Sequence, residues 1–423
     1  MIAPTDLITC AVLPIACVVG FAGATFGQHP EVATGLVAAH QALLDARSDV
    51  VVLNVAAHPD DESSRTNTML RRKHGMRIVT VYSTYGDGGQ NAIGREIGPA
   101  LAKIRVRETM RAAAMSDVDV RWLGMEDFGF SKTLAETLKF WGAEKLKDRM
   151  RGVIDRVDPD VIITNHTLNR GHGHHRASIW SVIEILKERA AAKKYVPRLY
   201  ARSGLDKAQL SFETGEVDIA RGQTYARVAY AAWVQHVSQG PWRDHNPMRV
   251  GRDYWRVHYP EGVSKADAAD LSQWGRSRLE VSVPAGLAML SQKHRRTAVM
   301  TALQNARRAA SRADEPAGTA VFARRAAALQ RLYLAMTGVS AEVWLAREDV
   351  PRGGVGTGYV VVHGHQLVSN LMVQCNGIDA ELVRQPVRRT PFDGRPRTTP
   401  KLPLPKVSDG ARTPVKQPAG KQP

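Results

Sequence analysis

Segments with the pattern of buried strands alternate with helical segments along residues 50–194, and this alternation limits the fold more than any other feature. Short runs rich in β-branched residues predict strands at residues 50–57, 77–84, 119–123 and 160–164. Apolar residues at helical spacing predict helices at residues 31–47, 62–74, 101–115, 138–157 and 176–194. Such alternation is typical of βαβ units. We therefore expect an α/β fold, Rossmann-like, in which a mostly parallel sheet carries helices on both faces.

The pattern changes after residue 200, and we divide the chain accordingly. The α/β domain is assigned to residues 30–205. The later segments are a mixed stretch at residues 206–262 with a helix at 224–237, a helix-rich extension at 263–345, and a short β segment at 346–384 with a strand pair at 358–373. Nine of the 22 prolines fall in residues 385–423, so we expect a disordered basic tail there.

Positive charge is concentrated in two segments of the chain. The formal net charge is +17, of which residues 293–331 carry +7 and residues 384–423 carry +8. Because the remaining chain is nearly balanced, we expect no nucleic-acid-binding core. The two segments predict a basic helical surface and a basic tail. These could contact an anionic cell envelope, or they could be solvated surface.

The N-terminal segment bears on the cellular compartment. Residues 7–24 carry no charge and end in small residues, which favours a signal peptide and export to the periplasm or outside the cell. The length also suits a marginal membrane anchor. No Lys or Arg precedes the run, so a buried N-terminus is the remaining alternative. Cys10 and Cys17 lie in this segment, and its removal would leave only Cys375, too few cysteines for a disulfide or a cysteine metal site.

Two polar loops follow predicted strands and carry the candidate chemistry. The first holds a His and a carboxylate three residues apart, at His58 and Asp61, and the second holds a His pair at His172 and His175. Taken singly, the carboxylates could cap a helix and the histidines could form a solvated loop. Loops at the carboxyl ends of parallel strands converge, however, and a His/Asp/His set is typical of catalytic zinc, with iron as an alternative. The expected chemistry is amide hydrolysis by metal-activated water.

The first loop, Ala57-His58-Pro59-Asp60-Asp61-Glu62, and the histidine pair that follows an Asp-Pro-Asp-Val strand resemble the PIG-L/LmbE family of zinc-dependent N-deacetylases. The resemblance implies a Zn²⁺ site and an N-acylated amino sugar or glycoconjugate as substrate. It makes His58, Asp61 and His175 the metal ligands, with Asp60 as general base. It makes His172 the catalytic histidine and places Arg170 where a charge would stabilise an oxyanion. Gly173 and His174 replace the Pro and Asp usual in the family, which affects the tuning of His172.

Weaker matches suggest residues around the substrate. Arg105 and Glu108 resemble a family Arg-x-x-Glu pattern, and Asp127 resembles a family Asp near the sugar. A segment around His236 resembles one that closes the pocket in larger members, so residues 206–262 are expected to close it here. Asp87 and Gln90 follow the second strand and could bind a polyol. Two alternative functions stay open: a catalytically impaired sugar-binding or glycan-binding protein, and an amidase of a thiol conjugate.

Overall fold

The computed structural model describes residues 16–19, 35–242, 251–275, 292–312, 316–337, 340–345, 357–363, 372–375 and 402–403. The chain divides into two compact units. One unit comprises Thr25–Met336, and the other comprises Met1–Ala24 together with Thr337–Pro423.

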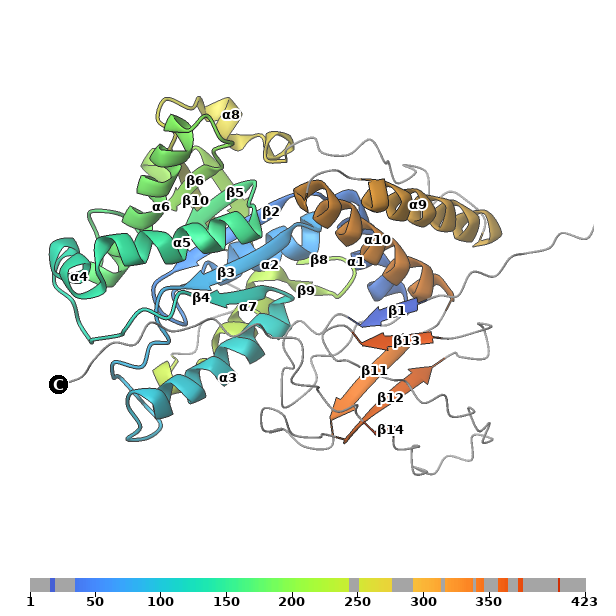
Figure 1. The fold of residues 1–423 in the computed structure, drawn as a ribbon, viewed down its shortest axis with the longest axis horizontal. Coiled ribbons are helices and arrows are strands. Elements are labelled where there is room, and N and C mark those ends of the chain that lie inside the picture. Colours follow the sequence, from blue (N-terminus) through green and yellow to red (C-terminus); the bar gives the residue numbers. More distant parts are fainter. Residues whose placement is uncertain are drawn as a thin grey trace, which may run out of the picture. The chain divides into compact units, whose positions relative to one another are not determined.

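A seven-stranded sheet forms the centre of the larger unit (Figure 1), in the order β4-β3-β2-β5-β6-β10-β7. Its strands are β2 (Val51–Ala56), β3 (Arg77–Tyr82), β4 (Asp119–Trp122), β5 (Val161–Thr164), β6 (Arg198–Arg202), β7 (Leu210–Glu213) and β10 (Arg252–Tyr259). The first five strands of this order, β4, β3, β2, β5 and β6, are parallel. Strand β10 runs antiparallel to both of its neighbours, β6 and β7. The predicted α/β class with a mostly parallel sheet is confirmed.

Helices cover both faces of this sheet, as the alternation of side chains along a strand requires. Leu53 and Val55 of β2 point into one core, with Met150 and Ile154 of α5. Val52 points into the other, with residues of α2 and α7. The helices of this region are α1 (Gly35–Arg47), α2 (Ser64–His74), α3 (Pro99–Ser116), α4 (Leu134–Trp141), α5 (Ala143–Val157), α6 (Gly173–Ala191) and α7 (Tyr225–Trp233).

Two expectations for the larger unit need correction, and three of its strands were missed. The single helix expected at residues 138–157 is two helices, because Gly142 ends α4 with φ +75° and α5 starts directly after it. Strands β6, β7 and β10, which extend the sheet, were not predicted. The second histidine motif is partly helical rather than a loop, since α6 already begins at Gly173.

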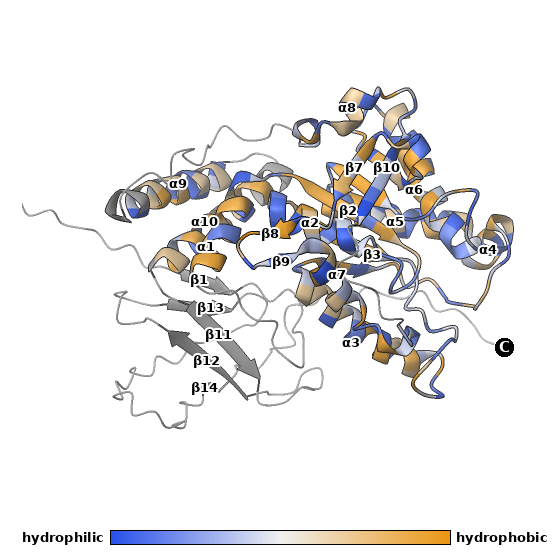
Figure 2. Ribbon diagram, turned by 180° about the vertical axis from the view of Figure 1, so that it is seen from behind, coloured by the Kyte–Doolittle hydropathy of each residue, from blue (hydrophilic) through white to orange (hydrophobic). Residues whose placement is uncertain are grey.

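Shorter elements connect the later part of the unit. They are η1 (Leu205–Lys207), the two-stranded sheet of β8 (Val217–Asp218) and β9 (Gln223–Thr224), η2 (Val237–Gln239), α8 (Lys265–Ala269) and η3 (Leu271–Gln273). The helical extension then supplies α9 (Gln292–Arg312) and α10 (Pro316–Thr337). Both helices alternate hydrophobic and hydrophilic residues (Figure 2). Their apolar residues, among them Leu303 and Leu329, pack with Ala42 and Ala46 of α1.

The smaller unit contains short strands. Strand β1 (Ala16–Val19) pairs in parallel with β13 (Met372–Cys375), and β12 (Thr357–His363) pairs with β11 (Ser340–Leu345) and β14 (Leu402–Pro403). The strand pair expected at residues 358–373 is therefore wrong in its pairing, because β12 and β13 each pair with other strands. Likewise, residues 340–345 form a strand and do not belong to the helical extension.

Most of the expected signal segment and of the expected disordered tail lies outside the described residues, so export and tail disorder stay predictions. Among the described residues, no helix is both long and apolar enough to cross a membrane.

Candidate active site

The two polar loops meet at the carboxyl ends of β2 and β5, as the strand order requires. Asp61 Oδ2 lies 3.0 Å from His58 Nδ1 and 3.3 Å from His175 Nε2. The backbone N–H of His58 also donates to Asp61 Oδ2 at 3.0 Å. His58 and Asp61 come from the turn before α2, and His175 comes from the first turn of α6. The structure thus brings together the three side chains for which the motif resemblance implies a metal.

The donor atoms of this cluster suit a divalent ion. His58, His172 and His175 have nitrogens within 4.8 Å of one another, and so do the donor atoms of Asp61, His166 and His175. The first group consists of three imidazoles, and the second of two imidazoles and one carboxylate; zinc or ferrous iron accepts either donor set. His58, Asp61 and His175 are each partly exposed, with 14%, 20% and 22% of the side-chain surface accessible, so a ligand can reach them from solvent.

Asp60 has an unusual backbone conformation. Its φ is +92°, a region that side chains other than glycine rarely adopt. Neighbouring segments hold the turn: Trp233 Nε1 donates to the carbonyl oxygen of Asp60 at 3.0 Å, and the Gln239 side chain donates to the carbonyl of Pro59. Because of this turn, Asp60 and Asp61 are adjacent in sequence but are not equivalent. Asp61 bonds to His58, whereas the carboxylate of Asp60 has no hydrogen bond to any described residue.

The pKa values of these two carboxylates are shifted in opposite directions. Burial raises the pKa of Asp60 well above its usual value, and the negative charges of Asp61 and Glu62 raise it further. Burial alone would also raise the pKa of Asp61, but hydrogen bonds to His175 and His58 outweigh it and hold that pKa well below the usual range. Burial lowers the pKa of His58, yet the hydrogen bond and charge of Asp61 outweigh that effect and the pKa is raised.

His172 faces the same cluster from the position directly before α6. Its ring centroid lies 4.1 Å from that of His175 and 5.1 Å from that of His58. Ser131 Oγ lies 3.2 Å from His172 Nδ1 and fixes the ring. Burial, followed by repulsion from His175 and His58, lowers the pKa of His172 to about 4, so the imidazole is neutral at neutral pH.

His174, which replaces the usual Asp, is fully buried. It stacks on Trp141 with ring centroids 4.7 Å apart and meets Phe128 edge-on at 4.5 Å. Its Nδ1 lies 3.0 Å from His58 Nε2, and its Nε2 is buried without a hydrogen-bond partner among the described residues. Burial, followed by the charges of neighbouring histidines, lowers the pKa of His174 to about 2. His174 therefore supports His58, whereas Ser131 supports His172.

Two residues of the site were not assigned from the sequence. His166 is buried after β5, where its Nε2 accepts the backbone N–H of Ala57 at 2.9 Å and its ring stacks on His175 at 4.3 Å. The sequence signal that could have identified His166 is its position directly after the fourth predicted strand, where the site residues gather. Glu62 was taken as a residue of the helix start. Its carboxylate instead accepts from Tyr82 Oη at 3.0 Å and from the backbone N–H of Asp60 at 3.1 Å.

Arg105 and Glu108 of α3 are buried and bind protein groups. Arg105 donates to the carbonyls of Gly86 and Gln90 and, at 3.2 Å, to Ser238 Oγ. Glu108 accepts from the backbone N–H and the hydroxyl of Ser238 at 2.8 and 2.7 Å. Together they tie the glycine-rich loop after β3 to η2, which indicates a role in holding the loops around the site.

The other predicted residues lie around the cluster at different depths. Asp127 accepts from the backbone N–H of Gly129, and its Oδ1 lies 3.9 Å from His174 Nδ1. Asp87 has one buried carboxylate oxygen without a hydrogen-bond partner among the described residues. His236 is buried 3.6 Å from Glu62, whereas the side chains of Gln90 and Arg170 are exposed. No observation here tests the roles assigned to these residues, which stay predictions.

Comparison with known proteins identifies the region that holds the cluster. Residues 53–186 match the PIG-L family model, described as GlcNAc-PI de-N-acetylase. A probable N-acetyl-alpha-D-glucosaminyl L-malate deacetylase 2 of Bacillus subtilis (strain 168) is 34% identical over 132 residues, covering 29% of this chain and 53% of that protein. The protein of the same name from Bacillus cereus is 28% identical over 133 residues, covering 30% and 56%. The chain thus spans about half the length of these curated relatives.

Two solved structures show weaker likeness. A 4-carboxy-2-hydroxymuconate hydratase from Pseudomonas putida KT2440 aligns with a TM-score of 0.36 and 15% identity, covering 51% of this chain and 98% of that one. An N,N'-diacetylchitobiose deacetylase from Pyrococcus horikoshii aligns with a TM-score of 0.38 and 19% identity, covering 49% and 83%.

The motif resemblance is confirmed by the family match, whose range includes His58, Asp61 and His175: residues 53–186 of this chain are a PIG-L family domain.

Proposed function

We propose that the protein is a metal-dependent hydrolase that removes the acetyl group from an N-acetylglucosamine conjugate. The PIG-L domain and the names of the two Bacillus relatives support this activity. One observation carries the proposal: the imidazoles of His58 and His175 both face Asp61 Oδ2. Their nitrogens Nδ1 and Nε2 lie 3.0 and 3.3 Å from that oxygen.

In this proposal His58, Asp61 and His175 hold a divalent ion, Zn²⁺ or Fe²⁺. Such an ion, when bound, would lower the pKa of a water molecule and polarise the amide carbonyl. The same three side chains leave space on the solvent side, since each is partly exposed. The protein then has to supply groups that accept and return a proton.

Asp60 is the proposed proton acceptor. It sits beside Asp61, its carboxylate makes no hydrogen bond to a described residue, and Trp233 fixes its backbone. His172 is the proposed donor to the leaving amine, because it contacts the same histidines and is oriented by Ser131. Since its imidazole is neutral at rest, it would first take up the proton that Asp60 accepts from the water and then pass it to the amine. Asp87 and Asp127 are proposed to bind sugar hydroxyls. Arg170 could approach the carbonyl oxygen only from the exposed loop before α6.

The test is acetate release from N-acetylglucosaminyl conjugates, including the L-malate conjugate, by zinc-loaded or iron-loaded protein. Asp60→Asn keeps the shape of the side chain but removes the proton acceptor, so turnover should fall by about 10²–10⁴-fold while metal content stays unchanged. Asp206→Asn, at an exposed position in η1, is the matched control and should retain wild-type turnover.

Two outcomes would contradict the proposal. If the metal-loaded wild type binds these conjugates but releases no acetate from any of them, the protein is a sugar-binding module. If it cleaves only the amide of a thiol conjugate, the proposed substrate class is wrong. Wild-type turnover by the Asp60→Asn protein would refute the role given to Asp60.

A further inference from the structure

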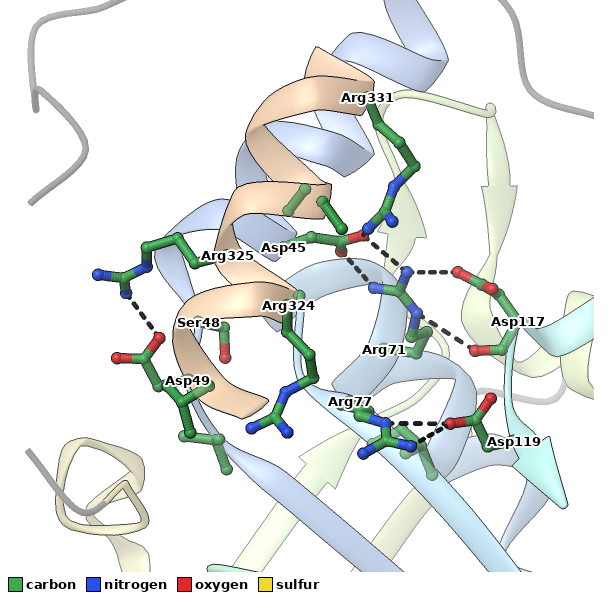
Figure 3. Close-up of a pocket in the computed structure, with 16 residues that line it drawn as sticks. Asp45, Ser48, Asp49, Arg71, Arg77, Asp117, Asp119, Arg324, Arg325 and Arg331 are labelled. Atoms are coloured by element: carbon green, nitrogen blue, oxygen red, sulfur yellow. Dashed lines mark hydrogen bonds and ion pairs between the residues drawn. The ribbon is translucent and has the colours of Figure 1, made fainter. Parts of the chain in front are cut away.

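A cavity lies at the amino ends of the strands, opposite the carboxyl ends that carry the candidate active site. It has a volume of about 240 Å³ and is bounded by α1, by the start of β3 and β4, and by α10. Arg77 and Asp119, the first residues of β3 and β4, line it, whereas the histidine cluster follows the last residues of β2 and β5. We call it the arginine pocket, because five arginines line it (Figure 3).

Four aspartates also line the arginine pocket, and each of them is paired with an arginine. The ion pairs are Arg71 with Asp45 and Asp117, Arg77 with Asp119 at 2.7 Å, Arg325 with Asp49 at 2.7 Å, and Arg331 with Asp45 at 3.0 Å. The acidic groups of the lining are therefore already engaged, and the lining carries one arginine more than it has aspartates.

Arg324 is the arginine without an ion pair among the described residues. Its Nη2 is buried and has no hydrogen-bond partner there. In Figure 3 the Arg324 side chain extends from α10 towards Arg77. No dashed line, which would mark a hydrogen bond or ion pair between the residues drawn, reaches it. Burial, followed by the positive charge of Arg77, lowers the pKa of Arg324, although Asp160 and Asp49 partly oppose this. Arg324 is partly buried, and leaving its buried Nη2 without a partner is unfavourable, so a bound anion would relieve that cost.

We propose that the arginine pocket binds a phosphate-class anion between Arg324 and Arg77. A guanidinium presents its N–H groups as a planar fork that matches phosphate oxygens, and Arg77, whose Nε and Nη2 donate to Asp119, keeps its Nη1 for the anion. The volume of about 240 Å³ is below the roughly 300–1,000 Å³ of pockets for drug-sized ligands, so the site takes a small anion. This site is independent of the proposed deacetylase activity.

The test is thermal unfolding of the metal-loaded full chain in inorganic phosphate, with sodium chloride and sodium acetate at equal ionic strength. Phosphate should raise the Tm by on the order of 3 °C for each tenfold increase above its dissociation constant, while acetate should not. Arg324→Met should abolish this response and leave the Tm without phosphate unchanged or higher, because it removes an unpaired buried charge.

Arg308→Met is the matched control, since Arg308 is exposed on α9 and, among the described residues, its side chain bonds only to Asn305. It removes the same charge away from the pocket and should keep the phosphate response. Phosphate also stabilises proteins generally by exclusion from their surface, and it can bind a catalytic metal. If the phosphate response persists in Arg324→Met, it arises from one of those effects and the proposal is wrong. If the wild type shows no phosphate response, the proposal is also wrong.

A phosphate monoester, glycerol 3-phosphate, distinguishes the source of the anion. Tighter binding of the monoester, measured by calorimetry, would assign the pocket to a phosphorylated metabolite, and tighter binding of inorganic phosphate would assign it to the free ion. Both results support a phosphate site, provided that Arg324→Met loses the binding. Binding that Arg324→Met retains would overturn it.

Discussion

Replacing Gly173 by alanine should disturb both the fold and the site. Gly173 is the first residue of α6, and a Cβ there would lie 2.2 Å from the backbone oxygen of Thr133 and 2.2 Å from Thr137 Oγ1. Ordinary contact begins at 3.4 Å, so the neighbours or the helix must move by about 1 Å. The Thr133 oxygen belongs to the backbone at the start of α4 and cannot rotate away. Overpacking of this kind costs about 1–3 kcal/mol, more than the gain of up to about 1 kcal/mol from helix propensity.

The expected result is a fall in Tm of roughly 2–10 °C, from about 2–4 °C per kcal/mol for a unit of this size. The first turn of α6 also carries His174 and His175, and a shift of about 1 Å in catalytic groups can cost about 10²-fold in turnover. Differential scanning calorimetry, metal analysis and acetate release measure the three effects. A shared loss of metal and turnover would place the damage at the ligands.

Gly152→Ala is the matched control for this substitution. Gly152 lies inside α5, where a Cβ would meet only the Arg156 guanidinium at 3.8 Å. That substitution should be neutral or stabilising by about 0.5–1 kcal/mol. A Gly173→Ala protein with wild-type Tm, metal content and turnover would refute the packing argument, because the clash would then have been absorbed without moving α6.

Three further predictions concern the metal, the ion pairs and the tail. Metal content should fall sharply in each of the variants His58→Ala, Asp61→Ala and His175→Ala. Full metal occupancy in the His175→Ala protein would contradict the ligand assignment. The control variant His258→Ala, outside the cluster, should keep its metal. Burial alone would raise the pKa of Asp45, but Arg71 holds it below its usual value. The stability that this pair contributes is present above the unfolded-state pKa of about 3.9 and is lost as the pH falls below it. The Tm of the Asp45→Asn protein should therefore fall less than the Tm of the wild type between about pH 4 and pH 2. Truncation after Gln385 should leave Tm within about 2 °C, and a larger drop would mean that the tail packs on the fold.

Local pattern was sufficient for the parallel part of the sheet. Each predicted strand from residue 50 to 164 exists, because β-branched runs buried on both faces have a distinct composition. The same alternation placed the two motifs at one edge of the sheet, and so the contact between Asp61 and His175 followed from topology. The break at Gly142 was missed because the hydrophobic spacing continues across it, and only the positive φ of that residue reveals two helices.

Long-range contacts account for what the sequence did not show. β10 carries a mixed pattern, with Trp255 buried and Arg256 exposed, and it becomes a strand by pairing with β6 and β7. Glu62 has the sequence context of a helix start, and only the fold brings Tyr82 and His236 to it. The unpaired state of Arg324 likewise depends on how α10 packs beside β3.

The hydrogen-bond pattern around His58 shows how the site accommodates His174 in place of an aspartate. Between His58 Nδ1 and an ionised Asp61, which can only accept, lies either a proton or the proposed metal ion. With a proton there, a neutral His58 accepts at Nε2 from His174 Nδ1 across 3.0 Å. With the ion there, Nε2 carries the proton of His58 and donates to His174 Nδ1, so one hydrogen bond joins the two rings in both states. The substitution therefore removes a negative charge but keeps a hydrogen bond to His58. Since Ser131 still holds His172, the departure from the family motif does not by itself disable the proton donor.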